Sequence, residues 1–148
     1  LVGRITEAVK QEIGDIPLMV KLAYIPSDDD LELMVRSTVG HGTVQGFSTI
    51  NTISAKLVDA NGNQALPGAG RDHSGVCGNA IRGAGLDMVA RLAAIREKLG
   101  LDFAINGVGG VVSPADYQAY RDAGADSVMS ATGAMWDAEL AHKIKASR

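Results

Sequence analysis

The chain has 148 residues, with 14 Lys and Arg against 17 Asp and Glu, so its formal net charge is −3. Hydrophobic residues make up 46% and charged residues 21%, which excludes a disordered chain and allows one domain with a buried core. The mild acidity is unlike the basic surface of a nucleic-acid-binding protein, and no apolar run approaches the roughly 20 residues that span a bilayer. We therefore expect no nucleic acid partner and no membrane span.

The cysteine and glycine counts add two further indications. The single cysteine, Cys77, excludes an internal disulfide and favours a reducing compartment, so we expect a cytoplasmic protein. Glycine occurs 18 times, which is above the usual ~7% and indicates tight turns or backbone that approaches a ligand closely. The chain begins at Leu1 without a methionine, and its first residues already have helical spacing, as in a fragment of a longer protein.

The first predicted elements alternate between helix and strand. Apolar residues recur at helical spacing over 4–13, with Gly14 at the position of a C-terminal cap. Residues 16–24 form an apolar run opened by a proline, which is typical of a strand buried on both faces. Ser27 is placed to cap the next helix, whose first turn carries three aspartates that favour the positive end of the helix dipole. A cation site is the alternative interpretation of these aspartates.

The middle of the chain contains a strand, a hairpin and a glycine-rich stretch. Residues 44–51 predict a second buried strand, and residues 54–67 predict a β-hairpin with a type I′ turn at Asn61-Gly62. The glycine-rich stretch that follows leads into a helix over 86–99.

The last third repeats the alternation of strand and helix. Residues 102–110 and 126–132 predict two further buried strands. Ser113 begins a helix as its N-cap, because Pro114 follows at the first helical position and an acid at the third. A final helix is expected over 134–145.

Buried strands that alternate with helices predict parallel βα units, of which this chain has four. A (β/α)8 barrel needs eight units and about 250 residues, so the chain would be half of such a barrel, a single partial domain over residues 1–148. A small open α/β sheet is the alternative, and periodicity does not decide between the two. An isolated half-barrel leaves sheet edges and an apolar face uncovered, so we expect either a homo-oligomer or a missing amino-terminal half.

Two glycine-containing turns follow the last two predicted strands, where parallel α/β folds bind their ligands. The first, INGVGG, ends in Gly109 and Gly110, and the second, SATGA, contains Ala131 and Thr132. Backbone N–H groups in such turns can bind a phosphate, and two turns on consecutive units favour a phosphate-bearing ligand. The alternative is that the glycines only permit tight βα connections.

Polar residues inside the first predicted strand and at the end of the second indicate a ligand in the same region. Lys21 interrupts an apolar strand, where an ammonium group costs desolvation energy unless it meets an anion or a polar cavity. Asn51 and Thr52, after the second strand, offer an amide and a hydroxyl to a planar polar substrate. A lysine that reaches solvent and ordinary turn chemistry are the alternatives for these residues.

Five segments, in this order and spacing, resemble the second half of dihydroorotate dehydrogenase-type flavin enzymes. They are PLMVKLAYIPSD, GFSTINT, HSGVCGNAI, INGVGGVVSPADYQAYRDAGADSVM and SATGAMWDAELA. The motifs are specific to the superfamily of FMN-binding barrels, which includes dihydropyrimidine dehydrogenases, and less specific to dihydroorotate. The resemblance implies the C-terminal half of a (β/α)8 TIM barrel. It also implies an FMN-dependent oxidoreductase of pyrimidine metabolism that acts on dihydroorotate or a related dihydropyrimidine.

The resemblance implies roles for individual residues as well. Lys21 would contact the pyrimidine edge of the flavin and balance charge on the reduced ring, while Asn51 and Thr52 would hold the substrate. The positions implied for FMN binding are Lys21, Ile50, Gly78, Gly109, Gly110, Ala131 and Thr132. Ala131 stands where the family commonly has glycine. Cys77 stands where it usually has serine, and we expect a small buried side chain there rather than a reactive thiol.

The resemblance places the proton-abstracting base, a cysteine or serine, in the first half of the barrel, so no catalytic residue is expected in this chain. His41, His73 and His142 occupy no matching position, and His73 is expected to be a solvated loop residue. We expect the chain to supply much of the FMN site and no metal site. The alternatives are a non-redox phosphate-binding barrel, such as an isomerase, aldolase or synthase, and a catalytically inactive half-barrel.

Overall fold

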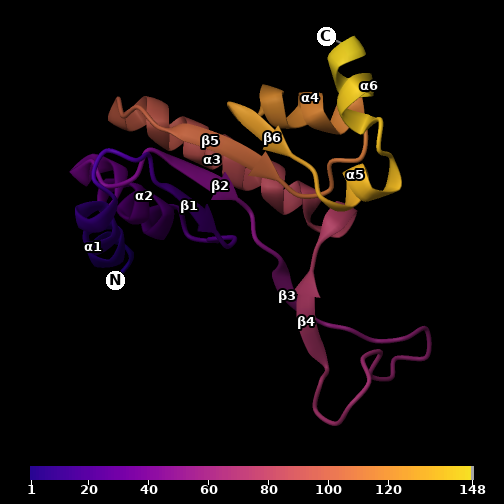
Figure 1. Cartoon of the computed structure of the whole chain (residues 1–148). Helices are drawn as coiled ribbons and strands as arrows, with labels where there is room; N and C mark the ends of the chain where they lie inside the picture. The colour runs from indigo at the N-terminus through magenta and orange to yellow at the C-terminus, as the bar shows by residue number, and fades with distance from the viewer. Residues whose placement is uncertain (148) are drawn as a thin grey trace.

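The computed structural model describes residues 1–147. The helices are α1 (Val2–Ile13), α2 (Asp28–Arg36), α3 (Arg82–Leu99), α4 (Pro114–Asp122), α5 (Thr132–Trp136) and α6 (Leu140–Ala146), with the 3-10 turns η1 (Val39–His41) and η2 (Gly78–Ile81). The strands are β1 (Met19–Leu22), β2 (Gly46–Thr49), β3 (Ile53–Lys56), β4 (His73–Val76), β5 (Ala104–Val108) and β6 (Ser127–Met129). Helices alternate with β1, β2, β5 and β6, as expected, and β3 and β4 lie between β2 and α3 (Figure 1).

The strands β1, β2, β5 and β6 form one parallel sheet in that spatial order (Figure 1). Lys21 on β1 pairs with Ser48 on β2, which pairs in turn with Asn106 on β5. The strands therefore follow one another in space in the order of the chain, without the reversal of strand order that marks a doubly wound sheet. This α/β arrangement is consistent with part of a (β/α)8 barrel.

Helix α3 covers one face of the sheet and forms the centre of the core. Figure 1 shows α3 running along the sheet behind β5. The fully buried side chains on this side come from two strands and three helices, and include Phe47, Ile105, Leu31, Met88, Leu92 and Tyr120. Burying an apolar side chain of this size stabilises the fold by about 1.5–3 kcal/mol, so this layer holds the sheet and helices together.

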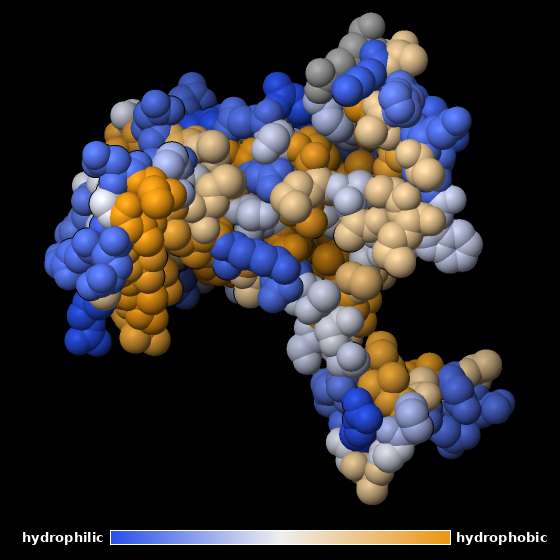
Figure 2. Space-filling model, in the orientation of Figure 1, coloured by the Kyte–Doolittle hydropathy of each residue, from blue (hydrophilic) through white to orange (hydrophobic). Residues whose placement is uncertain are grey.

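The opposite face of the sheet is not covered by helices of residues 1–147. Met19 on β1 is 47% exposed and Met129 on β6 is 53% exposed, and the Lys21 side chain is exposed as well. Apolar and hydrophilic side chains lie side by side on the face turned to the viewer (Figure 2). The expectation that residues 16–24 form a strand buried on both faces is therefore wrong for this chain, because helices pack on one face only.

A β-hairpin between β2 and α3 projects from the body of the molecule (Figures 1 and 2). In this hairpin Ile53 on β3 pairs with Val76 on β4, and Lys56 pairs with His73. The second strand thus lies in the glycine-rich stretch and not within 54–67, so the expected bounds of the hairpin are wrong.

The Asn61-Gly62 turn lies within the connection between β3 and β4. No non-glycine residue of the described chain has a positive φ, so the expected type I′ turn, which needs one at Asn61, is wrong. Instead, the Gly62 N–H donates to the Asp59 carbonyl, the Asp59 N–H donates to the Asn63 carbonyl, and Gly62 has a φ of 82°. The Asp59 carboxylate stabilises this turn by accepting the N–H groups of Asn61 and Asn63.

The N-caps of two helices are as expected from the sequence. The Ser27 hydroxyl accepts the Asp30 N–H at the start of α2, and the Ser113 hydroxyl accepts the Asp116 N–H at the start of α4. Serine at this position satisfies a backbone donor that the first helical turn leaves unpaired.

Within residues 1–147 no helix combines the length and apolar character needed to cross a membrane.

The single helix expected over 134–145 is instead split into α5 and α6. Asp137 separates the two helices in an extended conformation. Its carboxylate accepts the Glu139 N–H at 3.1 Å and pairs with Lys143 at 2.6 Å. The side chain of Asp137 thus offers the backbone a local partner that competes with helix continuation.

Candidate functional site

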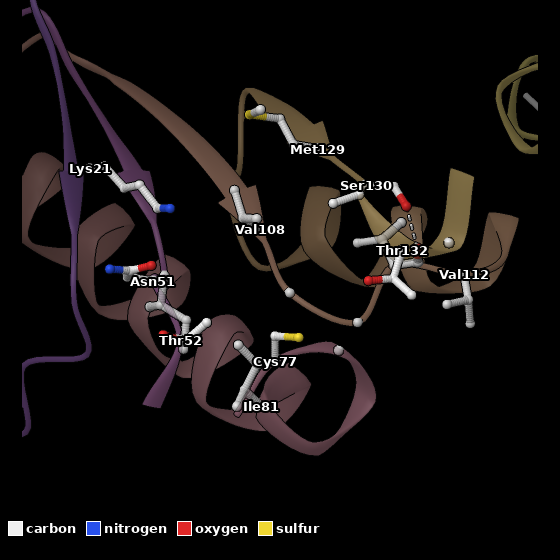
Figure 3. A pocket seen from close by; sticks show the side chains of 17 residues that line it. Lys21, Asn51, Thr52, Cys77, Ile81, Val108, Val112, Met129, Ser130 and Thr132 are labelled. Carbon is white, nitrogen blue, oxygen red and sulfur yellow. Dashed lines mark hydrogen bonds between the residues drawn. The ribbon is translucent and has the colours of Figure 1, made fainter. Parts of the chain in front are cut away.

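A cleft opens at the carboxyl ends of the four parallel strands (Figure 3). All nine residues that the sequence indicates for cofactor or substrate binding line it, namely Lys21, Ile50, Asn51, Thr52, Gly78, Gly109, Gly110, Ala131 and Thr132. The structure brings these residues together because the carboxyl ends of parallel strands meet at one edge of the sheet. What the residues bind remains a prediction.

Lys21 lies at one end of this cleft. Its side chain extends from β1 toward Val108, and Asn51 and Thr52 lie beside it (Figure 3). The Asn51 N–H donates to the Leu22 carbonyl at 2.8 Å, which holds the end of β2 against β1. Within the described part of the chain the Lys21 ammonium makes no hydrogen bond or ion pair. This end of the cleft therefore carries an unpaired positive charge.

The first glycine turn follows β5. Gly109 and Gly110 have φ values of 129° and 68°, which residues with a side chain rarely adopt. A Cβ on Gly110 would come within 2.9 Å of the Gly78 carbonyl oxygen and of the Asn79 Cα. The N–H groups of Gly109, Gly110 and Val111 donate to no other group of residues 1–147. The turn thus leaves backbone donors available for an anion.

The second turn, between β6 and α5, packs directly against the first. The Ser130 hydroxyl donates to the Val111 carbonyl at 2.7 Å (Figure 3). A Cβ on Gly133 would collide with the same carbonyl. In the described residues the N–H groups of Ala131 and Thr132 also have no acceptor. Both turns therefore present free N–H groups, and Figure 3 places Thr132 at the opposite end of the cleft from Lys21.

Tyr120 on α4 supports the first turn from the helical side of the sheet. Its fully buried side chain donates a hydrogen bond to the Gly109 carbonyl at 2.8 Å and approaches the Val108 carbonyl at 3.3 Å. Burial raises the pKa of the Tyr120 hydroxyl to about 12, so the group stays a neutral donor. Tyr120 thus occupies the Gly109 carbonyl from the helical side and leaves the N–H groups of the turn free.

Asp116, in the first turn of α4, holds the far end of the same turn. Its carboxylate accepts the Ser113 hydroxyl at 2.8 Å and the Val112 N–H at 3.2 Å, and it pairs with the Arg82 guanidinium of α3. Burial would raise the pKa of the Asp116 carboxyl, but the hydrogen bonds and the Arg82 charge outweigh burial and hold the pKa below its ordinary value. The carboxylate is therefore charged and tied to α3.

Apolar side chains lie between the two ends of the cleft. Val108 and Met129 line it from β5 and β6, and Ile50 lines it from directly after β2. The Asn106 amide donates to the Met129 sulfur at 2.7 Å and to the Ser48 hydroxyl at 3.3 Å, which fixes Met129 in place. The cavity measures about 190 Å³, less than the ~300–1,000 Å³ of typical small-molecule sites. The described residues thus supply one wall of a site that is open on the uncovered side of the sheet.

Cys77 lines the cleft beside Gly78 and is exposed, so the expectation of a buried side chain at this position is wrong. No histidine is present among the described residues that line the cleft. His73 is exposed on β4 and contacts Asp72 at 2.9 Å, and His41 borders a separate cavity near α1. In residues 1–147 no group of three or more His, Cys, Asp or Glu side chains is arranged to hold a metal ion.

Four residues that shape the cleft are missed by sequence reasoning: Arg82, Asp116, Tyr120 and Ser130. The sequence identifies Asp116 only as the third residue of a capped helix, and Tyr120 lies in an ordinary helical pattern. Arg82 reaches the turn from α3, which precedes β5, and Tyr120 reaches it from α4, which follows the turn, so no local motif identifies these contacts. Ser130 offers a usable signal, because it directly precedes the predicted turn at Ala131-Thr132.

Comparison of the sequence with a family model and with curated proteins points to one family. The family model described as dihydroorotate dehydrogenase matches residues 2–147. A dihydroorotate dehydrogenase of Dictyostelium discoideum is 39% identical over 131 residues, which are 87% of this chain and 35% of that protein. A dihydroorotate dehydrogenase (quinone) of Methylibium petroleiphilum is 33% identical over 141 residues, which are 92% of this chain and 38% of that protein. The chain thus spans little more than a third of the length of these curated relatives.

Proposed function

The chain belongs to the dihydroorotate dehydrogenase family. We propose that it supplies the FMN site of an oxidoreductase, and that this oxidoreductase acts on a CH–CH bond of dihydroorotate or a related dihydropyrimidine. We propose also that its four βα units are the C-terminal half of a (β/α)8 barrel. One observation carries both proposals. A single cleft has the unpaired Lys21 at one end and two turns with free N–H groups at the other.

The two turns fit the phosphate end of FMN. A phosphate is bound well by several backbone donors that converge from neighbouring turns. The N–H groups from Gly109 to Val111, with those of Ala131 and Thr132, would supply these donors. Ala131 has a negative φ of −108°, so this position does not need the positive φ that favours glycine. The alanine at a position where the family commonly has glycine is therefore compatible with phosphate binding.

The remainder of the cleft fits the flavin ring. The ring would pack against Ile50 and Val108, with the Lys21 ammonium at its pyrimidine edge. A Cβ on Gly78 would meet no atom within 4 Å, so this part of the wall leaves space for a ligand. Flavin, when bound, supplies a hydride acceptor. Lys21 would place a positive charge where negative charge develops on reduction, and its contribution would be electrostatic.

Asn51 and Thr52 would hold the substrate beside the ring. Their amide and hydroxyl groups can pair with the N–H and carbonyl groups of a dihydropyrimidine. Removing a hydride from such a substrate also requires a base that accepts the partner proton. The resemblance implies a cysteine or serine base in the first half of the barrel, whereas Cys77 and Ser130, which line this cleft, belong to the segments matched to FMN binding. We therefore assign the base to a part of the barrel outside this chain.

The absorption spectrum of the complete protein that carries this chain tests the proposed function. We expect a bound flavin with its yellow absorption, and bleaching of that absorption when dihydroorotate is added without oxygen. A colourless protein that takes up no FMN would contradict the proposal. Binding of a sugar phosphate in preference to FMN would contradict it too, and would favour a non-redox phosphate-binding barrel.

The half-barrel is tested separately by sedimentation of residues 1–148. The uncovered sheet face and the unpaired edges of β1 and β6 would expose apolar surface and backbone groups to water. We expect the isolated chain to self-associate. A stable monomer over a wide concentration range would contradict this expectation.

A further inference from the structure

An ion pair between a buried carboxylate and a partly exposed arginine lies behind the first glycine turn, and the function proposed above does not use it. The Asp116 carboxylate is 7% exposed and accepts the Val112 N–H, and Arg82 is the cation that pairs with it. Arg82 also touches the turn directly, because a Cβ on Gly110 would come within 2.9 Å of the Arg82 Cβ. The pair therefore joins the starts of α3 and α4 to the turn.

We infer that Arg82 sets the affinity of this turn for phosphate by neutralising the Asp116 carboxylate behind it. The inference rests on the proposed function, since it takes the ligand of the turn to be the FMN phosphate. Asp116 orients the turn by accepting the Val112 N–H. The same carboxylate carries a negative charge close to donors that receive an anion. Arg82 offsets that charge and leaves the hydrogen bonds of Asp116 intact.

Arg82 is thus a positioning residue, and its electrostatic effect on phosphate binding can be distinguished from a purely structural role in holding the turn. If Arg82 only held the turn in place, its loss would disorder the turn and weaken the binding of any flavin. Loss of charge compensation weakens only the binding of a ligand that carries phosphate. FMN and riboflavin differ by the phosphate group alone, so the ratio of their Kd values isolates the electrostatic effect.

A second ion pair on α3 provides a matched control. Arg96, near the C-terminal end of α3, pairs with Asp126 at 2.6 Å. The Asp126 carboxylate accepts the Ile105 N–H at 2.7 Å, as Asp116 accepts the N–H of Val112. This pair lies near the amino ends of β5 and β6, and neither of its residues lines the cleft. Breaking it changes a similar ion pair without touching the turn.

The experiment uses the complete protein, stripped of flavin, and measures the Kd of FMN and of riboflavin by flavin fluorescence. Arg82→Gln is expected to weaken FMN binding about tenfold or more while riboflavin binding stays within about twofold. Arg82→Lys keeps the charge and should keep most of the preference for FMN. Arg96→Gln should leave the preference unchanged. Raised salt should reduce the effect of Arg82→Gln, because Arg82 is partly exposed.

Two variants of Asp116 complete the test. Asp116→Asn keeps an acceptor for the Val112 N–H but removes the negative charge, so it should strengthen FMN binding relative to riboflavin. Arg82→Gln combined with Asp116→Asn should restore the preference of the wild type to within about threefold. Equal losses for FMN and riboflavin in Arg82→Gln would overturn the inference, and so would a failure of the double variant to recover.

The outcomes also separate this inference from the proposed function. A wild-type protein that binds neither flavin would contradict both. A wild type that prefers FMN, with a preference that no charge change at Arg82 or Asp116 alters, would overturn the inference alone. If Arg82→Gln does not fold, as judged by thermal denaturation, Asp116→Asn decides, because a reduced preference for FMN in that variant would overturn the inference.

Discussion

The two ends of the parallel sheet use similar polar groups to different effect. At the amino ends, the Asp126 carboxylate accepts both the Arg96 guanidinium and the Ile105 N–H, so these donors have an acceptor within the chain. At the carboxyl ends, the N–H groups of two turns and the Lys21 ammonium have no partner among residues 1–147. These donors at the amino ends are satisfied within the chain, whereas the carboxyl ends leave donors free.

Stability and ligand binding therefore depend on different groups in this fold. Polar groups that are withdrawn from water without a partner cost free energy, so paired groups at the amino ends stabilise the chain by themselves. Free donors at the carboxyl ends contribute when a ligand supplies the acceptor. Changes to paired groups should therefore alter stability, and changes to the glycine turns or the free ammonium at the carboxyl ends should alter ligand binding more.

Gly110→Ala should give the largest effect and the sharpest contrast. The new Cβ would come within 2.9 Å of backbone atoms of Gly78 and Asn79, and the φ of 68° is strained for alanine. Together these effects amount to roughly 2–5 kcal/mol, so we expect FMN retention to fall about a hundredfold. The flavin content of the purified protein and a fluorescence titration measure this.

Gly100→Ala is the control, because Gly100 lies at the C-terminal end of α3, away from the cleft. Gly100 has a φ of 60°, but a Cβ there would meet no atom within 4 Å. We expect it to lower the free energy of unfolding by about 1 kcal/mol and to leave flavin content unchanged. If Gly100→Ala loses as much flavin as Gly110→Ala, the contrast between the two ends fails.

Lys21→Ala should give the next largest effect. Its charge is needed most when the flavin is reduced, so we expect the rate of reduction by dihydroorotate to fall about a hundredfold and the Kd of FMN to rise less than tenfold. Stopped-flow absorbance measures the first quantity and fluorescence the second. Lys10→Ala, which removes hydrogen bonds to Ile16 and Gln45 at the amino ends, should leave both unchanged. Equal losses in reduction and binding for Lys21→Ala would contradict the role assigned to it.

Tyr120→Phe should give a moderate loss of stability and a smaller loss of binding. The variant leaves the Gly109 carbonyl without its buried donor, which costs about 1–3 kcal/mol in the free energy of unfolding. Urea denaturation measures the loss. Tyr24→Phe removes an exposed hydrogen bond to Asp87 and should leave stability nearly unchanged. Identical midpoints for wild type and Tyr120→Phe would show that the hydroxyl does not support the turn.

The smallest effect concerns pH and Asp116. The folded state holds the pKa of Asp116 below its ordinary value of 3.8, so ionised Asp116 stabilises the fold above that value. This contribution is lost as the pH falls through the lower pKa of the folded state. Asp116→Asn should therefore be about 1 kcal/mol less stable than wild type at pH 7, and the difference should shrink in acid. A difference in unfolding free energy that stays constant from pH 7 into strong acid would contradict this.

Local chemistry explains which parts of the fold the sequence predicts well. Ser27 and Ser113 are identified as caps because the signal is local. Each serine is followed by an acid in the first helical turn, and its hydroxyl accepts an N–H only three residues away. The partner of β3 is missed because β4 lies 17 positions beyond the end of β3 in a glycine-rich stretch, while Asn61-Gly62 offers a nearer turn. The break between α5 and α6 is missed because it depends on the contacts of one side chain, the Asp137 carboxylate, with the Glu139 N–H and Lys143.

The candidate site divides in the same way. Gly109 and Thr132 are predicted because the fold class alone brings strand ends together, and Lys21 is predicted because an ammonium group interrupts an apolar strand. Arg82 and Tyr120 are not predicted, because their contacts depend on how α3 and α4 pack against the sheet. The exposure of Cys77 depends on what covers the cleft, and no pattern within the chain determines that.

A crystal structure of the complete protein with FMN bound would locate the phosphate and the flavin ring relative to the two turns and Lys21. We predict that the FMN phosphate lies within hydrogen-bond distance of the backbone nitrogens of Gly110 and Thr132, and that the Lys21 ammonium contacts the flavin ring. A phosphate bound away from both turns, or a Lys21 side chain directed away from the ring, would contradict this prediction.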